Sequence, residues 1–155
     1  MAKTQRDISL LRRSWAYWWY AWGSSLCYWG IRTAERSFFR AGVGAYGRAV
    51  RAWPEFSAAY LRRGVIRGRE LGEHREAVAD LTRVIELSPE WPEPYLQRGL
   101  TQRFHGDPRA AVGDLERYLE LGGMPVWREE AERQLAMLRE DLAGGGGAGL
   151  ERTPL

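Results

Sequence analysis

The chain has 155 residues, 45% of them apolar and 28% charged, which is the composition of a folded domain rather than a disordered chain. Its single cysteine, Cys27, excludes an internal disulfide framework, and its two histidines are too few and too separated to suggest a metal site. Residues 1–70 carry 13 basic and 4 acidic side chains, whereas residues 71–155 carry 10 and 16. We interpret this asymmetry as solvated faces of a helical protein, with self-association, nucleic acid or a membrane as alternatives.

Aromatic side chains dominate the first element, residues 1–23, and the start of the next. From Ile8 and Leu11 onward, large apolar residues recur every three or four positions, which is the spacing of one helix face. We predict a helix over 7–22 that ends at Gly23-Ser24-Ser25, where a serine caps the next helix. Five of the 8 tryptophans belong to this segment: Trp15, Trp18, Trp19, Trp22 and Trp29.

Three interpretations of this tryptophan stripe remain open. The preferred one is that the helix packs against the helices that follow and that the tryptophans fill the contact. The second is a membrane contact through residues 14–31, because this stretch has no charge, arginines flank it, and Trp and Tyr prefer the membrane–water boundary. The third is a dimerisation surface, since exposed aromatic patches mark interfaces.

An internal repeat lies further along the chain. The pattern Y-L-x-R-G followed by an aliphatic residue begins at Tyr60 and again at Tyr95, an offset of 35. Downstream, the segments 72–81 and 106–115 match with an offset of 34. A period of this length indicates stacked helical units. The change of offset places one extra residue after Gly64, as a helix bulge or as a longer turn.

Each unit reads as two helices, and in the first unit these run from about Tyr60 to Leu71 and from about Arg75 to Leu87. The apolar spacing of the second helix follows a 3.6-residue period. Gly72 supplies the permissive backbone that a tight turn needs, and Pro108 falls in the first turn of a helix. We therefore predict an all-α fold of helix–turn–helix repeats.

These residues resemble the tetratricopeptide repeat (TPR) family, a 34-residue helix–turn–helix with small and large apolar residues at fixed positions. One repeat, 57–91, carries the motif at Tyr60, Gly64, Ala77, Leu81 and Pro89. The next repeat, 92–124, carries it at Tyr95, Gly99, Ala111 and Leu115, with Gly123 in place of the proline. The small residues let the two helices of each unit approach closely.

A weaker match precedes these repeats. Counting back from Pro54 places Ala49, Tyr46, Gly42 and Gly30 at the family's small and aromatic positions. We interpret 24–56 as a degenerate repeat whose second helix runs from about Gly42 to Trp53, with a turn near Ser37-Phe38-Phe39.

A helix and a glycine-rich tail follow the repeats. The spacing predicts a capping helix over 125–142, with Trp127, Ala131, Leu135, Leu138 and Leu142 on one face and charges on the other. The tail, 143–155, contains Gly144–Gly147 and is predicted to be disordered.

The resemblance implies that the first helix of each repeat lines a groove for a partner peptide. Some TPR proteins clamp a C-terminal carboxylate there with Lys and Asn, but this chain has no Asn and only Lys3. We expect an apolar lining with arginines at its edge, which suits an apolar segment with acidic flanks. A groove filled by the chain's own terminal helix is the alternative. The candidate groove residues are Leu61, Val65, Arg69, Leu96, Leu100 and Arg103.

Nothing in the sequence suggests catalysis: it lacks a phosphate-binding loop and paired histidines on a helix. We expect no catalytic residue, no cofactor and no bound metal, and we expect Cys27 to be an inert buried thiol. The predicted function is non-catalytic binding of a protein or peptide in the cytoplasm. The alternatives are a membrane-associated subunit and a homo-oligomer. Weaker still is nucleic-acid binding through the basic half, using Arg62, Arg63, Arg67 and Arg69.

Overall fold

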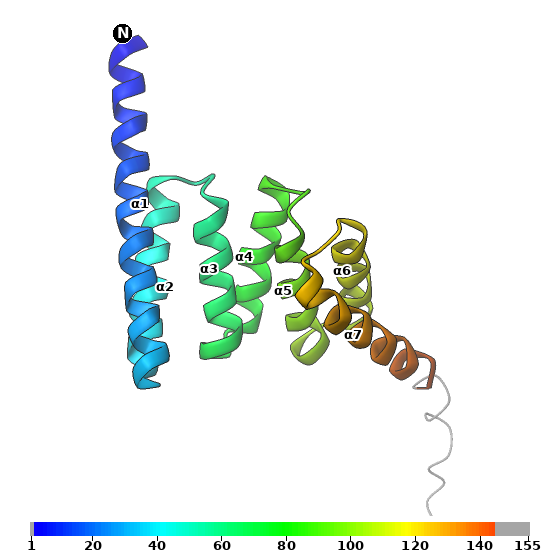
Figure 1. Cartoon of the computed structure of the whole chain (residues 1–155). Coiled ribbons are helices and arrows are strands. Elements are labelled where there is room, and N and C mark those ends of the chain that lie inside the picture. The colour runs from blue at the N-terminus through cyan, green and yellow to red at the C-terminus, as the bar shows by residue number, and fades with distance from the viewer. Residues whose placement is uncertain (1, 145–155) are drawn as a thin grey trace, which may run out of the picture. The chain divides into compact units, whose positions relative to one another are not determined.

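The computed structural model describes residues 2–144, in which helices are joined by short turns and no strand occurs. The all-α prediction is therefore confirmed. The residues form two compact units, Met1–Ser88 and Pro89–Leu155, whose elements are labelled in Figure 1. In chain order, the elements are α1 (Ala2–Thr33), α2 (Arg36–Ala52), α3 (Ser57–Ile66), the π-helical turn η1 (Arg67–Leu71), α4 (His74–Leu87), α5 (Pro92–His105), α6 (Pro108–Glu120) and α7 (Pro125–Gly144).

Helical hairpins make up both units, as the repeat predicts. In the first unit α1 packs on α2 and α3 packs on α4, while in the second α5 packs on α6. Gly72 ends η1 with a left-handed φ of 73°, a conformation that glycine adopts at little cost. Asp107 caps α6 by accepting a hydrogen bond from the Arg109 N–H at 2.9 Å, and Pro108 follows at the first helical position.

Glycine permits the close approach within both repeats. A Cβ added at Gly64 would lie 3.1 Å from Leu81 Cγ and 3.2 Å from the Ala77 carbonyl oxygen. A Cβ added at Gly99 would meet Leu115 Cγ at 3.2 Å and the corresponding alanine oxygen at 3.3 Å. The predicted role of the small residues is confirmed at the same positions in both repeats.

The extra residue of the first repeat is absorbed by η1, the π-helical turn that continues α3. A π turn holds one more residue than an α turn, so the helix continues without losing its direction. Leu71, at the end of η1, joins a buried cluster with Cys27, Phe39 and Tyr46. Its carbonyl oxygen accepts a hydrogen bond from Arg36 Nη2 at 2.9 Å. Of the two forms predicted for the insertion, the structure contains the bulge.

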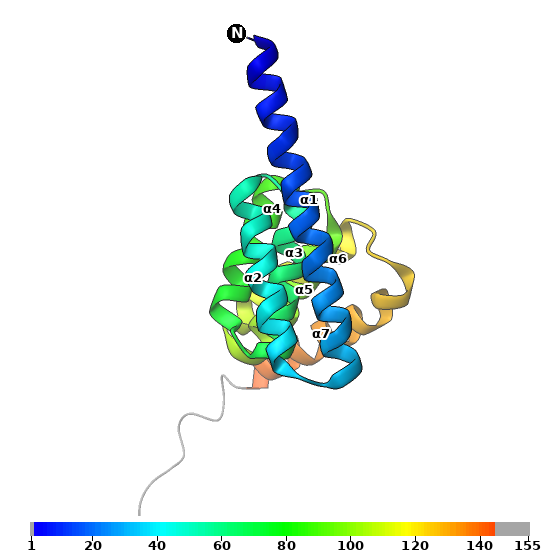
Figure 2. The same ribbon diagram turned by 90° about the vertical axis from the view of Figure 1, so that its left-hand side faces the viewer.

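The first helix differs from its prediction, because α1 runs unbroken from Ala2 to Thr33 through Gly23-Ser24-Ser25. The two serines cap nothing here. Ser24 Oγ donates to the Tyr20 carbonyl oxygen at 3.0 Å, and Ser25 Oγ donates to the Ala21 carbonyl oxygen at 3.2 Å. These are bonds to the preceding turn of the same helix, which helices tolerate. The N-terminal part of α1 extends past the end of α2 (Figures 1 and 2).

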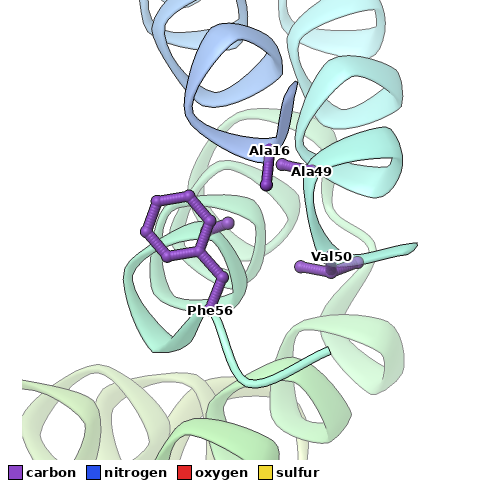
Figure 3. Close-up of a cluster of buried hydrophobic side chains, with 5 residues drawn as sticks. Ala16, Ala49, Val50 and Phe56 are labelled. Carbon is purple, nitrogen blue, oxygen red and sulfur yellow. The ribbon is translucent and has the colours of Figure 1, made fainter. Parts of the chain in front are cut away.

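Small residues bring α1 and α2 close together along most of their contact. A Cβ added at Gly42 of α2 would lie 2.5 Å from Cys27 Sγ, and one added at Gly23 of α1 would lie 2.9 Å from the Tyr46 ring. Near the end of α2, Ala16 lies against Ala49, with Phe56 beside them (Figure 3). The predicted packing of this helix on the following one is present, and Trp19 takes part in it. The other four tryptophans of the stripe are at least half exposed, so they do not fill the contact as predicted.

The turn between α1 and α2 falls earlier than predicted, at Ala34 and Glu35 instead of near 37–39. Ala34 adopts φ 57°, the left-handed region where glycine is usual. The second helix accordingly begins at Arg36 rather than near Gly42. The segment 24–56 has no first helix of its own, because its first half is the end of α1.

The C-terminal helix packs on α6, with Ala131, Leu135 and Leu138 buried. Trp127 and Leu142, predicted to share this face, are more exposed, at 45% and 38%. Helix α7 includes residues 143 and 144. The rest of the predicted disordered tail, 145–155, lies outside the described residues.

Candidate functional site

Three of the predicted groove residues lie in the first unit and three in the second. In the first unit, Leu61 is only 3% exposed and belongs to the core of α3. Val65 is half-buried and Arg69 is exposed. Val65 and Arg69 are therefore the members of this trio that a partner can reach.

The second trio belongs to α5. Leu96 is 2% exposed, while Leu100 and Arg103 are half-buried. The Arg103 guanidinium lies 4.9 Å from the centre of the Phe104 ring. Its Nη2 lies 3.9 Å from the Met137 sulfur of α7. The Arg103 guanidinium thus lies against an aromatic ring and a thioether, and its Nη1 is buried without a hydrogen-bond partner among the described residues.

A pocket of about 150 Å³ opens beside α5 in the second unit. Leu96 is the predicted groove residue that lines it. Tryptophans from the start of α5 and of α7 stand beside it, and Tyr118 comes from α6. Its lining residues are Trp91, Pro92, Glu93, Leu96, Gln97, Tyr118, Met124 and Trp127.

The turn after α6 shapes this pocket. Gly123, which replaces the family's proline, lies so close to the Tyr118 ring that an added Cβ would overlap it. The Tyr118 hydroxyl donates a hydrogen bond to the Met124 carbonyl oxygen at 3.3 Å. Burial raises the pKa of Tyr118, so the phenol remains a neutral donor. The glycine thereby allows the turn to close over the ring and hold Met124 at the pocket.

The pocket combines an apolar lining with a few polar groups. Glu93 supplies a carboxylate and Gln97 an amide, and no lysine or arginine is among the lining residues. A concave apolar surface with a few placed polar groups is the usual chemistry of a binding site. The arrangement can therefore enclose an apolar side chain and accept hydrogen bonds from N–H groups beside it.

Sequence reasoning placed Trp127 on one face of the capping helix and missed the role of Trp91 and Trp127 in the pocket. A signal was available, because these tryptophans are about one repeat length apart, near the starts of α5 and α7. Met124 carries no such signal, since its position depends on the turn around Gly123.

The tryptophan stripe forms a second exposed surface, on α1. Trp15, Trp18, Trp22 and Trp29 are 50% to 56% exposed, and Trp19 is partly buried against the cluster that contains Ala16. The rings of Trp15 and Trp18 stack with centres 5.4 Å apart, and those of Trp18 and Trp22 with centres 6.1 Å apart. Among the described residues, no helix has both the length and the hydropathy needed to cross a membrane.

Two of the four arginines assigned to nucleic-acid binding are already engaged. Arg63 holds the buried Asp80 through Nε at 2.8 Å and through Nη2, and Arg67 Nη1 reaches the same carboxylate at 2.8 Å. The guanidinium groups of Arg63 and Arg67 are therefore paired with a carboxylate inside the hairpin. Arg69 remains exposed, so the predicted basic cluster is smaller than the sequence suggests.

Cys27 lies buried between α1 and α2. Burial raises the pKa of its thiol above the ordinary value of 9.0. The thiol therefore stays protonated near neutral pH, which disfavours nucleophilic reactivity.

Comparison with known proteins agrees with the repeat pattern and the fold. No family model matches the chain. The human protein named tetratricopeptide repeat protein 36 is 34% identical over 113 residues, which are 70% of this chain and 57% of that protein. The chain is a tetratricopeptide repeat protein. It spans just over half the length of this curated relative.

Solved TPR domains share the fold. The Arabidopsis OM64 TPR domain superposes with a TM-score of 0.70 at 19% identity, covering 83% of this chain and 98% of that one. The TPR2B domain of yeast Sti1, in complex with an Hsp70 peptide, gives 0.63 at 18%, covering 77% and 97%. The second TPR domain of human RPAP3, in complex with the HSP70 peptide SGPTIEEVD, gives 0.65 at 18%, covering 80% and 98%.

Proposed function

We propose that this TPR protein binds a segment of another protein, without chemical conversion, and that the pocket of the second unit is the anchor point. The observation that carries the proposal is the opening beside Leu96, where Trp91 and Trp127 leave an apolar space of about 150 Å³. The yeast and human TPR domains of similar fold, which were solved with bound peptides, support a peptide as the occupant.

The pocket chemistry favours an apolar side chain from within a partner segment over a chain terminus. The chain has no Asn, and Lys3 is its only lysine, so it lacks the residues with which some TPR proteins hold a terminal carboxylate. Instead, Glu93 and Gln97 offer oxygens to backbone N–H groups flanking an inserted Leu, Met or Phe. The chain's own C-terminal helix, α7, forms part of the pocket wall through Trp127.

The other accessible groove residues are part of the proposal as secondary contacts. Leu100 and Arg103 follow Leu96 along α5, and Arg103 would pair with an acidic group of the segment. Val65 and Arg69 offer the same kind of contact within the first unit. We place this binding in the cytoplasm, which cell fractionation of the tagged chain tests directly.

The test uses a panel of labelled peptides in which a single Leu, Met or Phe stands between acidic residues, with binding followed by fluorescence anisotropy. Replacing Leu96 with Asp would bury a carboxylate and unfold the helix pair, so Trp127→Ala is the informative variant. We expect it to weaken binding at least about tenfold, the loss typical of a buried aromatic anchor. Trp29→Ala, an exposed tryptophan of the first unit, is the matched control.

Two results would count against the proposal. One is that no apolar peptide of the panel binds to the folded chain. The other is that Trp127→Ala and Trp29→Ala reduce binding equally, because that would place the contact elsewhere.

A further inference from the structure

The outward side of α1 is an aromatic surface that stays about half exposed within its own unit. Leu11, Trp15, Trp18, Trp22 and Trp29 recur at helical spacing along it, each at least half exposed. Tyr17 and Tyr28 at its border are exposed as well, at 54% and 57%, although the Tyr17 ring also lies against Phe56 and Trp53. Because successive residues are 100° apart around a helix, the tyrosines widen the surface well beyond a single stripe. We call this surface, with these seven residues, the aromatic face.

Arginines border the aromatic face, and acidic residues are nearly absent around it. Between residues 9 and 54 the chain has seven arginines and one acidic residue, Glu35. Arg48 of α2 places its guanidinium 4.6 Å from the centre of the Trp19 ring. An open hollow of about 390 Å³ lies beside this contact, between Arg12, Trp15, Trp19, Arg48, Arg51 and Ala52.

We propose that the aromatic face and its bordering arginines dock on an anionic membrane surface, with α1 lying along the boundary of the bilayer. Indole and phenol rings favour the headgroup region, where their apolar bodies leave water and their polar tips stay hydrated. Arg12, Arg48 and Arg51 are placed to pair with lipid phosphates. Helix α1 does not have the hydropathy to cross the bilayer, so it binds flat.

The breadth of the aromatic face favours a lipid surface over a single partner helix. A helix pair needs only a narrow seam, whereas no charged residue occurs anywhere around α1 between Ser14 and Ile31. Pairing two copies through this face would also bring two arginine-bordered surfaces together, with Glu35 as the one acidic residue between residues 9 and 54.

The stacking of the tryptophans disfavours single-stranded nucleic acid. In proteins that bind single-stranded nucleic acid, the bases stack on exposed faces of aromatic rings. Here the planes of Trp15 and Trp18 are 8° from parallel, as are those of Trp18 and Trp22, so each ring of this row already stacks on a neighbouring indole. Such a row offers a base fewer free ring faces than isolated tryptophans would, and it suits the headgroup region of a membrane.

Cosedimentation of the full chain with vesicles tests the proposal. One set of vesicles contains equal parts phosphatidylcholine and phosphatidylglycerol, and the other contains phosphatidylcholine alone. We expect binding to the anionic vesicles, weaker binding to the neutral ones, and release as salt is raised. Changing Trp15, Trp18 and Trp22 together to Gln should weaken binding at least about tenfold, because their apolar area no longer leaves water.

Variants with matched controls separate the aromatic and charged contributions. Arg48→Gln with Arg51→Gln should weaken binding to anionic vesicles about thirtyfold, since each basic residue near such a surface contributes about 1 kcal/mol. Arg75→Gln with Arg109→Gln removes two exposed charges elsewhere and should leave binding unchanged. Trp127→Ala should also have no effect, and circular dichroism checks that every variant is folded.

The proposal is overturned if the folded chain does not sediment with anionic vesicles, or if the control variants lose binding to the same extent. It is equally overturned if the tryptophan variant instead turns a dimer into a monomer, or abolishes binding to a single-stranded oligonucleotide, with no vesicle binding in either case. The peptide pocket does not enter this experiment, so the two proposals stand or fall separately.

Discussion

Arg98 of α5 holds the buried carboxylate of Asp114 in α6 at two points, with Nε–Oδ2 at 2.8 Å and Nη2–Oδ1 at 2.7 Å. Asp114 is only 6% exposed. The carboxylate raises the pKa of the Arg98 guanidinium, which keeps its charge at all ordinary pH values. Arg63 and Asp80 repeat the arrangement in the first unit. In the hairpins α3–α4 and α5–α6, a buried aspartate thus pairs with arginine from the preceding helical segment beside the glycine contact.

Removing one member of the pair should cost more than removing both. Asp114→Ala leaves Arg98 without its buried acceptor, and we expect the free energy of unfolding to fall by about 3 kcal/mol. Arg98→Met combined with Asp114→Leu should recover most of that loss, because no charge is left unpaired. Urea unfolding followed by circular dichroism measures both effects.

The exposed pair between Arg117 and Glu120 is the control for this experiment. Glu120→Ala should cost less than about 1 kcal/mol, since a solvated pair contributes little. A loss from Glu120→Ala as large as that from Asp114→Ala would show that burial does not set the difference.

Two glycines on α2 should respond in opposite directions to alanine. At Gly42 the added Cβ would lie 2.5 Å from Cys27 Sγ, so Gly42→Ala should separate α1 from α2 and cost about 1–3 kcal/mol. At Gly44 the nearest atom is Arg48 Nη1 at 3.9 Å, so Gly44→Ala should stabilise the helix by about 0.5–1 kcal/mol. Thermal unfolding of the two variants gives the comparison, and the same sign for both would contradict the structure.

The π turn should be removable. Deleting Gly68 restores the 34-residue spacing within the first repeat and allows η1 to close as an ordinary α turn with the flanking side chains in place. We expect the deletion to change the free energy of unfolding by less than about 1 kcal/mol, the range of most substitutions away from a core. Deleting Thr101 from the regular helix α5 rotates the rest of that helix and should destabilise the second unit. If both deletions unfold the chain, the prediction is contradicted, because η1 is then needed for the fold.

The first unit should lose stability in alkaline solution. Burial raises the pKa of the Cys27 thiol above its ordinary value of 9.0, and burial also raises the pKa of Tyr46 beside it. The unfolded chain therefore releases these protons first, so stability is full below the ordinary thiol pKa and falls as pH rises above it. Urea unfolding across this range measures the slope.

Cys27→Ala reports the share of the thiol in that slope. The variant should show a shallower decline with pH, while a decline equal to that of the parent chain would remove Cys27 as its cause. In the native chain a thiol reagent should modify Cys27 only as fast as the helices separate.

The sequence predicts the repeats well because their turn glycines and close-packed alanines are fixed by local geometry. It leaves the form of the extra residue near Gly68 open, since a bulge and a longer turn give the same offset. It fails at Gly23, where glycine and two serines are typical of a helix boundary. In the structure that glycine makes room for the Tyr46 ring, and the helix continues.

The candidate sites were harder to predict, for two physical reasons. Along α1, small residues such as Ala16 and Cys27 recur at the same helical spacing as the tryptophans, so the pattern alone does not say which set faces α2. The pocket depends on Gly123 lying against the Tyr118 ring, a contact between a turn and a helix that has no periodic signal. Leu96 was predicted as a groove residue from the family resemblance, and the structure shows that it both lines the pocket and belongs to the core.

The stacked rings of Trp15, Trp18 and Trp22 also give α1 a spectroscopic signal of its own. Three parallel indoles held at fixed separations absorb as coupled chromophores, whose circular dichroism in the near ultraviolet depends on their mutual angles. The signal would change when a ligand inserts between the rings or when the helix bends. The unmodified chain therefore carries a built-in probe of whatever touches that helix, which requires no label.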